Sequence, residues 1–175
     1  MATGKPPFDV LAHHARFNEA EMRAVLGPDP AFITIVREPA SLFESLYSYY
    51  DLESETHLSL EELVAGRASS DDTLRWLAFE RGWSKVGTNQ MSFDLGLEPA
   101  FFENVSAVHA FTQRLDATFN LVMVAERMNE SLVLLRDLLR WDLDDVVIFK
   151  HNTRQPPPWA TTPDIRLTEL IQAFY

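Results

Sequence analysis

The sequence contains no cysteine, which excludes disulfide bonds and thiolate metal sites and leaves the redox compartment open. It has no run of about 18 consecutive apolar residues, the length that a membrane-spanning helix needs. Basic residues are also scarce, because 15 Lys and Arg stand against 26 Asp and Glu for a net charge of −11. This balance argues against nucleic acids and other long polyanions as partners, since they are bound through many basic contacts. The acidic net charge is still compatible with binding a neutral ligand or one small anion.

What the sequence contains fits one folded domain over residues 1–175. Its composition is 46% hydrophobic, which is ample for one core. The predicted strands are residues 8–13, 32–36, 120–125 and 146–149. The predicted helices are residues 19–26, 58–65 and 71–81, with three more starting at residues 39, 129 and 163, and residues 85–97 are expected to be a loop. Ser59 and Glu62 form a capping-box pair at the start of the helix of residues 58–65. The alternation predicts an α/β fold with a central parallel sheet.

The most informative segment is a strand followed by a helix in the first third of the chain. Phe32–Val36 is apolar and β-branched, which predicts a parallel strand buried on both faces. Glu38 is the predicted N-cap and Pro39 the first helical residue, and the free amides of this helix start would attract an anion. Arg37 and Ser45 would add a guanidinium and a hydroxyl on the same side. The pattern predicts a phosphate site, and the alternative is an arginine paired with a carboxylate and a serine tolerated on a helix surface.

Two adjacent histidines end the first predicted strand. In a parallel sheet, His13 or His14 would open on the same carboxyl-edge crevice as Arg37. Histidine is a natural general base near neutral pH, although an adjacent pair is more often structural or exposed. No metal site is expected, because the pair is not at helical spacing and has no third ligand nearby.

The Arg37 and Ser45 pattern resembles the 3′-phosphate-binding motif of sulfotransferases, in which an arginine ends a strand and a serine follows eight residues later. Three further stretches resemble one branch of these enzymes, the galactose 3-O-sulfotransferases, which include galactosylceramide sulfotransferase. They are residues 8–18, residues 89–96 and residues 119–150. Together with the phosphate motif they cover about residues 8–154, so the resemblance spans most of the chain.

The resemblance implies a P-loop NTPase-like sulfotransferase fold and a sulfuryl-transfer reaction. The donor would be 3′-phosphoadenosine 5′-phosphosulfate and the acceptor the 3-hydroxyl of galactose on a glycolipid or glycan, with no metal. Arg37 and Ser45 would bind the 3′-phosphate of the donor. Removal of the hydroxyl proton requires a base, and the family implies His14, with His13 as the alternate.

The resemblance also suggests contacts with the acceptor and a cellular location. Asn89 and Asp94 match the family's Asn-x-x-x-x-Asp-Leu-Gly stretch and, with Arg16, are weaker candidates for binding the sugar. A turn-stabilising role for Asn89 and Asp94 is an equal alternative. Family members are anchored in the Golgi membrane and act in its lumen, which predicts this location through an anchor absent from the chain. Glycosylation sequons at Asn104 and Asn129 are compatible with a lumen, although Asn129 is also a candidate helix N-cap.

One expected element of the family is missing. Sulfotransferases hold the 5′-phosphosulfate with a loop that carries Lys and Ser or Thr and that should precede residue 8. Gly4–Pro7 does not replace it, because it has no hydroxyl residue and its two prolines remove amides. The chain is therefore expected to be a partial domain that lacks this loop and the C-terminal end. The alternative is an inactive binding module that retains the fold, and a nucleotide kinase is disfavoured because no G-x-x-x-x-G-K-[ST] motif occurs.

Overall fold

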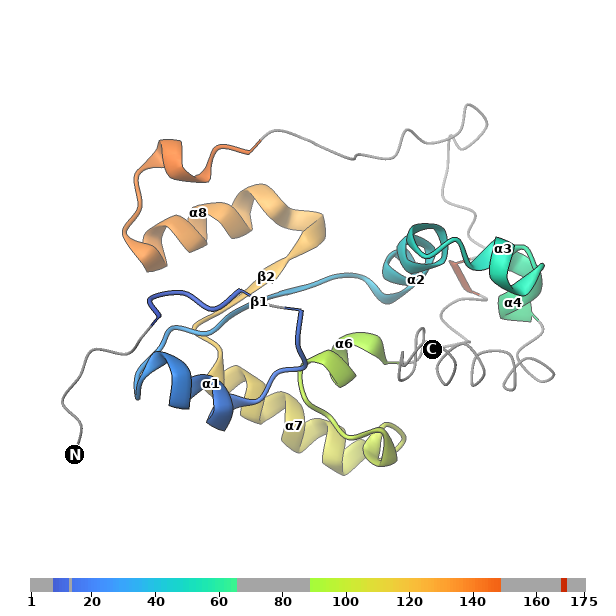
Figure 1. The fold of residues 1–175 in the computed structure, drawn as a ribbon, viewed down its shortest axis with the longest axis horizontal. Coiled ribbons are helices and arrows are strands. Elements are labelled where there is room, and N and C mark those ends of the chain that lie inside the picture. The colour runs from blue at the N-terminus through green and yellow to red at the C-terminus, as the bar shows by residue number, and fades with distance from the viewer. Residues whose placement is uncertain (1–7, 13, 66–88, 149–167, 170–175) are drawn as a thin grey trace. The chain divides into compact units, whose positions relative to one another are not determined.

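A computed structural model describes residues 8–12, 14–65, 89–148 and 168–169, and the chain divides into two compact units. Residues 1–36 and 89–123 form the first unit, and residues 37–88 and 124–175 form the second. The described elements are α1 (Glu19–Leu26), β1 (Ile33–Val36), α2 (Pro39–Tyr49), α3 (Leu52–Thr56), α4 (Leu60–Ala65), α6 (Gln90–Asp94), η1 (Pro99–Phe101), α7 (Val105–Thr118), β2 (Leu121–Val124), η2 (Ala125–Arg127), α8 (Met128–Leu139) and η3 (Leu143–Val146) (Figure 1). The chain is thus mixed α/β and mostly helical. The expectation of one partial domain stays a prediction.

A two-stranded sheet joins β1 to β2. The strands run parallel from matching starts, because the Phe32 carbonyl accepts hydrogen bonds from the Asn120 and Leu121 amides at 2.9 and 3.4 Å. The Asn120 Oδ1 atom in turn accepts from the Phe32 amide at 2.8 Å. Both strands lie within two residues of their predicted bounds. The prediction that β1 is buried on both faces is wrong, because Ile35 is 51% exposed.

Aromatic packing holds the first unit together around Phe17, Phe32 and Phe119. The Phe17 ring lies edge-on to Phe32 at 5.3 Å and tilted against Phe119 at 4.8 Å between centroids. Such pairs contribute roughly 0.5–1.5 kcal/mol beyond the area that they bury. Helix α1 starts where Asn18 caps it and ends at Gly27, whose positive φ of 98° closes the last turn. These bounds match the prediction.

The second unit has its core between α2, α3 and α4. Ala40, Phe43 and Tyr47 lie one helical turn apart on α2, and they pack with Leu52 and Leu63 in one buried cluster. Burial of an apolar side chain of this size stabilises by about 1.5–3 kcal/mol. The buried Tyr47 hydroxyl donates to the carbonyl of Leu58 at 2.6 Å, and burial raises the pKa of Tyr47.

Helix α4 begins with the predicted capping box. The Glu62 carboxylate accepts from the Ser59 amide at 2.9 Å, and the Ser59 hydroxyl accepts from the Glu62 amide at 3.3 Å. The Ser59 hydroxyl also donates to the Glu62 carboxylate at 2.7 Å, and this hydrogen bond, together with the one from the Ser59 amide, lowers the pKa of Glu62. The pattern read from the sequence is confirmed, because both partners lie within one helical turn and need no tertiary contact.

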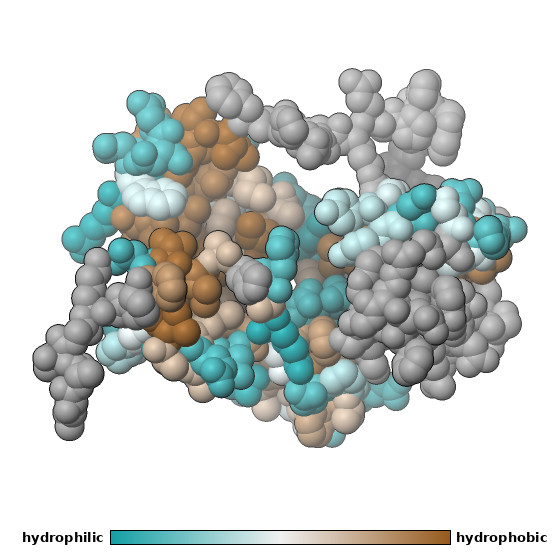
Figure 2. Space-filling view, viewed as in Figure 1, coloured by the Kyte–Doolittle hydropathy of each residue, from teal (hydrophilic) through white to brown (hydrophobic). Residues whose placement is uncertain are grey.

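Helix α8 follows β2 after the single turn η2 and is tied to it by one buried hydroxyl. Ser131 donates to the Val124 carbonyl at 3.2 Å and accepts from the Val124 amide at 2.9 Å. Outside this contact, α8 and the turn after it carry an apolar surface, visible as brown atoms in Figure 2. Its exposed members are Val133, Leu134, Leu138, Trp141, Leu143, Val147 and Ile148. Within the described ranges, each helix is too short or too polar to cross a bilayer.

Three predicted elements differ from the structure. Residues 8–12 form no strand, and Val10 is 77% exposed; residue 13 lies outside the described residues. Residues 143–146 form η3, and residues 147–148 after it are not a strand. Part of the predicted loop is the short helix α6. A short apolar run becomes a strand only when a neighbour pairs with it, and the run itself does not specify that neighbour. The predicted helix at residues 71–81 lies outside the described residues, as does nearly all of the last one.

Candidate functional site

The junction between β1 and α2 carries the residues predicted to bind phosphate. Arg37 follows the last residue of β1, and Pro39 is the first residue of α2, as the sequence predicted. Glu38 is the N-cap, and its carboxylate accepts from the amides of Ala40 at 3.0 Å and Ser41 at 2.7 Å. This capped helix start fixes the direction of α2 relative to Arg37.

The same contacts correct one expectation about this helix start. The amides of Ala40 and Ser41 are not free for an external anion, because the Glu38 carboxylate already binds them. A second carboxylate oxygen, Oε1 of Glu126, accepts from the Glu38 amide at 3.0 Å. The sequence predicted that Glu38 caps the helix. It did not predict that the Glu38 carboxylate would bind the amides expected to hold an anion. A phosphate bound here therefore depends on side chains.

Ser45 is placed by helical geometry on the side of α2 opposite its core. It lies seven residues after Glu38, which is about 20° short of two full turns and about 10 Å along the helix axis. Phe43, two residues earlier and therefore about 200° around the helix, is fully buried in the second unit. Arg37 and Ser45 are both partly buried and belong to this same unit. Their pairing as a phosphate clamp stays a prediction.

The candidate base belongs to the other unit. His14 lies in a bend before α1 and is exposed, whereas His13 is outside the described residues. His14 is therefore accessible for proton transfer in the first unit. Its role as a base stays a prediction, as does the assignment of His13 as the alternate.

Two residues beyond His14, Arg16 is held firmly against the segment that contains α6. Its Nε atom donates to the Phe93 carbonyl at 2.9 Å, and its guanidinium carbon lies 4.5 Å from the centre of the Phe93 ring. Its Nη1 atom lies 2.9 Å from Oε1 of Glu98. Arg16 thus contacts the segment that carries Asp94, and its role in binding the sugar stays a prediction.

Asn89 and Asp94 have structural partners of their own. Asn89 adopts a positive φ of 51° before α6, and its carbonyl accepts from the Phe93 amide at 2.9 Å. The Asp94 carbonyl accepts from the Phe17 amide at 2.7 Å, and its carboxylate accepts from Gln90 at 3.0 Å. The Asp94 contacts join α6 to the segment before α1, whereas the Asn89 side chain makes no capping hydrogen bond. Contact of either with a sugar stays a prediction.

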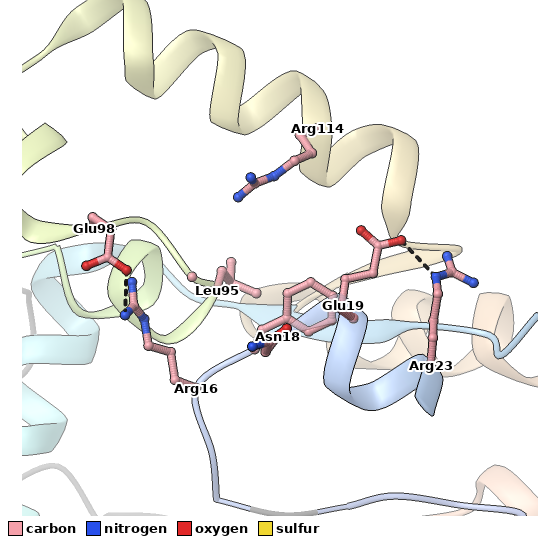
Figure 3. Close-up of a pocket in the computed structure, with 10 residues that line it drawn as sticks. Arg16, Asn18, Glu19, Arg23, Leu95, Glu98 and Arg114 are labelled. Carbon is pink, nitrogen blue, oxygen red and sulfur yellow. Dashed lines mark hydrogen bonds and ion pairs between the residues drawn. The ribbon is translucent and has the colours of Figure 1, made fainter. Parts of the chain in front are cut away.

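A pocket of about 650 Å³ opens beside Arg16 in the first unit (Figure 3). Three arginines line it from different places in the sequence. Arg16 precedes α1, Arg23 belongs to α1 and pairs with Glu19 at 2.8 Å, and Arg114 extends from α7 toward the cavity. The other lining residues are Phe17, Asn18, Ala20, Leu95, Gly96 and Glu98. The pocket therefore offers both donors and acceptors of hydrogen bonds beside apolar carbon.

Sequence reasoning identified Arg16 but missed Glu98 and Arg114. Neither belongs to a motif, and 16 residues separate them in the chain. The weak signal was Gly96, which ends the Asn89 stretch at a positive φ two residues before Glu98. Among the described residues, no group of three or more His, Asp or Glu side chains is arranged to hold a metal ion.

Comparison with known proteins gives one consistent family. The family model described as Galactose-3-O-sulfotransferase matches residues 1–167. The chain is 36% identical over 157 residues to galactose-3-O-sulfotransferase 3 of Mus musculus, covering 86% of the chain and 35% of that relative. It is 33% identical over 158 residues to galactosylceramide sulfotransferase of Mus musculus, covering 86% and 36% respectively. The chain thus spans about a third of the length of these curated relatives. No solved structure matches it.

Proposed function

The chain belongs to the galactose-3-O-sulfotransferase family, and on that premise we propose that it carries part of the substrate-binding machinery of a sulfotransferase. The full enzyme would move a sulfuryl group from 3′-phosphoadenosine 5′-phosphosulfate to the 3-hydroxyl of galactose. Relatives named for galactose and for galactosylceramide support a glycolipid or glycan acceptor. The parallel strands and the strand-to-helix junction are compatible with a P-loop NTPase-like sulfotransferase fold.

The observation that carries the donor-binding proposal is the capped junction of β1 and α2. It places Arg37 at the strand end and Ser45 on the side of α2 away from the core. Because Glu38 occupies the first helix amides, Arg37 would grip the 3′-phosphate bidentately and Ser45 would donate its hydroxyl. Side-chain charge, and not the helix dipole, would then supply most of the affinity.

The donor supplies a sulfuryl group that is activated by its anhydride bond to phosphate. Neutral His14 would take the proton from the galactose 3-hydroxyl as the oxygen attacks sulfur. The anhydride S–O bond breaks as the new S–O bond forms, and the electron pair leaves with adenosine 3′,5′-bisphosphate. Exposure of His14 is consistent with this role, because the base must meet an acceptor that enters from solvent.

The proposed location is the Golgi lumen, as for the resembled family. Asn104 and Asn129 are both exposed, so either sequon is accessible to glycosylation. Asn104 caps α7 by accepting from the Ala107 amide at 3.0 Å through Oδ1, which leaves Nδ2 for a glycan. Asn129 lies inside the first turn of α8 and is not its N-cap, since that position is Arg127. The alternative explanation of Asn129 as a cap is therefore wrong.

Calorimetric titration of the 175-residue chain with adenosine 3′,5′-bisphosphate tests the donor site. Hydrogen bonds to charged groups contribute about 1.5–3 kcal/mol, so Arg37→Ala is expected to weaken binding by roughly 10- to 150-fold. Ser45→Ala should cost about 0.5–1.5 kcal/mol. Arg136→Ala is the matched control, because Arg136 is half-exposed and pairs with the adjacent Asp137.

Unchanged affinity in Arg37→Ala would show that the site is assigned wrongly. The inactive-module alternative has a separate outcome. It is favoured if the chain binds the bisphosphate through Arg37 while a longer form of the protein, offered donor and galactoside, releases no sulfated product.

A further inference from the structure

We propose that the pocket beside Arg16 binds the terminal galactoside of the acceptor, with Glu98 and Arg114 as residues that determine its specificity. The proposal rests on the proposed function, since that function supplies the identity of the sugar. The volume of the pocket, about 650 Å³, falls within the range of about 300–1,000 Å³ typical of small-molecule sites. All of its lining residues belong to the first unit, so its geometry does not depend on the second.

The pocket is preorganised by contacts between two segments far apart in the sequence. The Phe17 amide donates to the Asp94 carbonyl at 2.7 Å, and Arg16 donates to the Phe93 carbonyl at 2.9 Å. Gly96 permits this approach, because a Cβ atom there would lie 3.0 Å from the Phe17 carbonyl oxygen. A cavity whose walls are already fixed loses little entropy when a ligand binds.

The polar groups around the cavity suit sugar hydroxyls. The Glu98 carboxylate is well exposed and contacts Arg16 through Oε1, which leaves Oε2 to accept from a hydroxyl. Arg114 is exposed, points toward the cavity in Figure 3, and has no hydrogen bond or ion pair among the described residues. Its guanidinium lies 5.4 Å from the centre of the Phe111 ring, which orients it without using its N–H donors. An acceptor and a donor thus line the same pocket.

Arg16 adds unused hydrogen-bonding capacity at the same place. Its Nη2 atom is buried and has no hydrogen-bond partner within the described part of the chain. An unsatisfied buried donor is unfavourable, so a ligand oxygen that reaches it would be bound strongly. The side chains of Leu95 and Phe17 supply apolar carbon beside these groups, as an amphipathic sugar ring requires.

The pocket carries little net charge and lies close to the candidate base. Two of its arginines are already paired with Glu98 and Glu19, so one net positive charge remains. His14, the candidate base, is two residues before Arg16, and two residues of extended chain span at most about 7 Å. A galactoside in this pocket would therefore lie near the group proposed to take its proton.

Titration of the ¹⁵N-labelled 175-residue chain with methyl β-D-galactoside, followed by NMR, tests the proposal. The expected shift changes cluster at residues 16–18 and 95–98 and at the Arg114 side chain. Glu98→Gln and Arg114→Ala should each weaken binding about tenfold or more, because each removes a charged hydrogen-bonding partner. Glu103→Gln and Arg136→Ala are the matched controls and should bind as the original chain does.

The proposal is overturned if galactoside shifts no pocket resonance, or if both pocket variants keep the original affinity while their amide spectra show an intact fold. It is also overturned if only inorganic sulfate shifts these resonances, since the pocket would then be an anion site. Adenosine 3′,5′-bisphosphate is titrated separately. Galactoside binding without bisphosphate binding would refute the donor site and leave the pocket assignment standing.

Discussion

Replacing Glu38 by alanine tests whether the start of α2 is stabilised as its contacts indicate. The carboxylate accepts from the Ala40 amide at 3.0 Å and the Ser41 amide at 2.7 Å. In Glu38→Ala both amides lose these acceptors, and the positive end of the helix dipole loses a neighbouring negative charge. The substitution therefore removes a cap without altering the buried cluster formed by Phe43 and Tyr47.

The size of the effect follows from these contacts. Loss of an N-cap costs about 0.5–2 kcal/mol, and a charge at a helix terminus contributes about 0.3–1 kcal/mol. Because the same carboxylate supplies both effects, we expect a total loss of about 1–2 kcal/mol in the free energy of unfolding. With a urea m-value of about 2 kcal/mol/M, the unfolding midpoint should fall by about 0.5–1 M.

Urea unfolding followed by far-UV circular dichroism measures this change. Glu103→Ala is the control, since it removes the same charge from an exposed residue before α7 and should leave the midpoint within about 0.25 M. Glu38→Gln retains an acceptor oxygen and should lie between the two. If Glu38→Ala unfolds at the same midpoint as Glu103→Ala, the cap does not stabilise α2 and the reasoning is refuted.

Two further predictions concern a pH dependence and a glycine. Hydrogen bonds from Ser59 lower the pKa of the Glu62 carboxyl in the folded protein. The ionised carboxylate therefore stabilises the folded protein above the ordinary carboxyl pKa. This stabilisation is lost as the pH falls through the lowered pKa of the folded protein. In Glu62→Gln, the free energy of unfolding in urea should therefore change less with pH between pH 3 and 6 than in the original protein. Identical pH dependence in the two proteins would contradict this prediction. Gly96→Ala should cost about 1–3 kcal/mol, because φ is 104° and the new Cβ would lie 3.0 Å from the Phe17 carbonyl oxygen. Asn89→Gly, at another positive φ, should stay within about 1 kcal/mol of the original protein, and an equal loss in both variants would refute the steric argument.

Features that depend on neighbours along the chain could be predicted from the residue types alone. The bounds of α1, the Glu38 cap before Pro39 and the capping box of Ser59 and Glu62 all agree with the structure. Each rests on partners no more than about one helical turn apart, so local residue types suffice to specify it. The family could also be recognised from the sequence, since its motifs are stretches of consecutive residues.

Features that need partners far away in the chain became apparent in the folded protein and could not be predicted from the sequence. The burial of β1 depends on what packs against it, and an apolar run shows its tendency to be buried but not which segment will cover it. The Glu126 carboxylate reaches the Glu38 amide across 88 residues, and Glu98 and Arg114 meet Arg16 around one pocket. Such contacts form only when whole helices and strands pack together. No short pattern in the sequence predicts that packing.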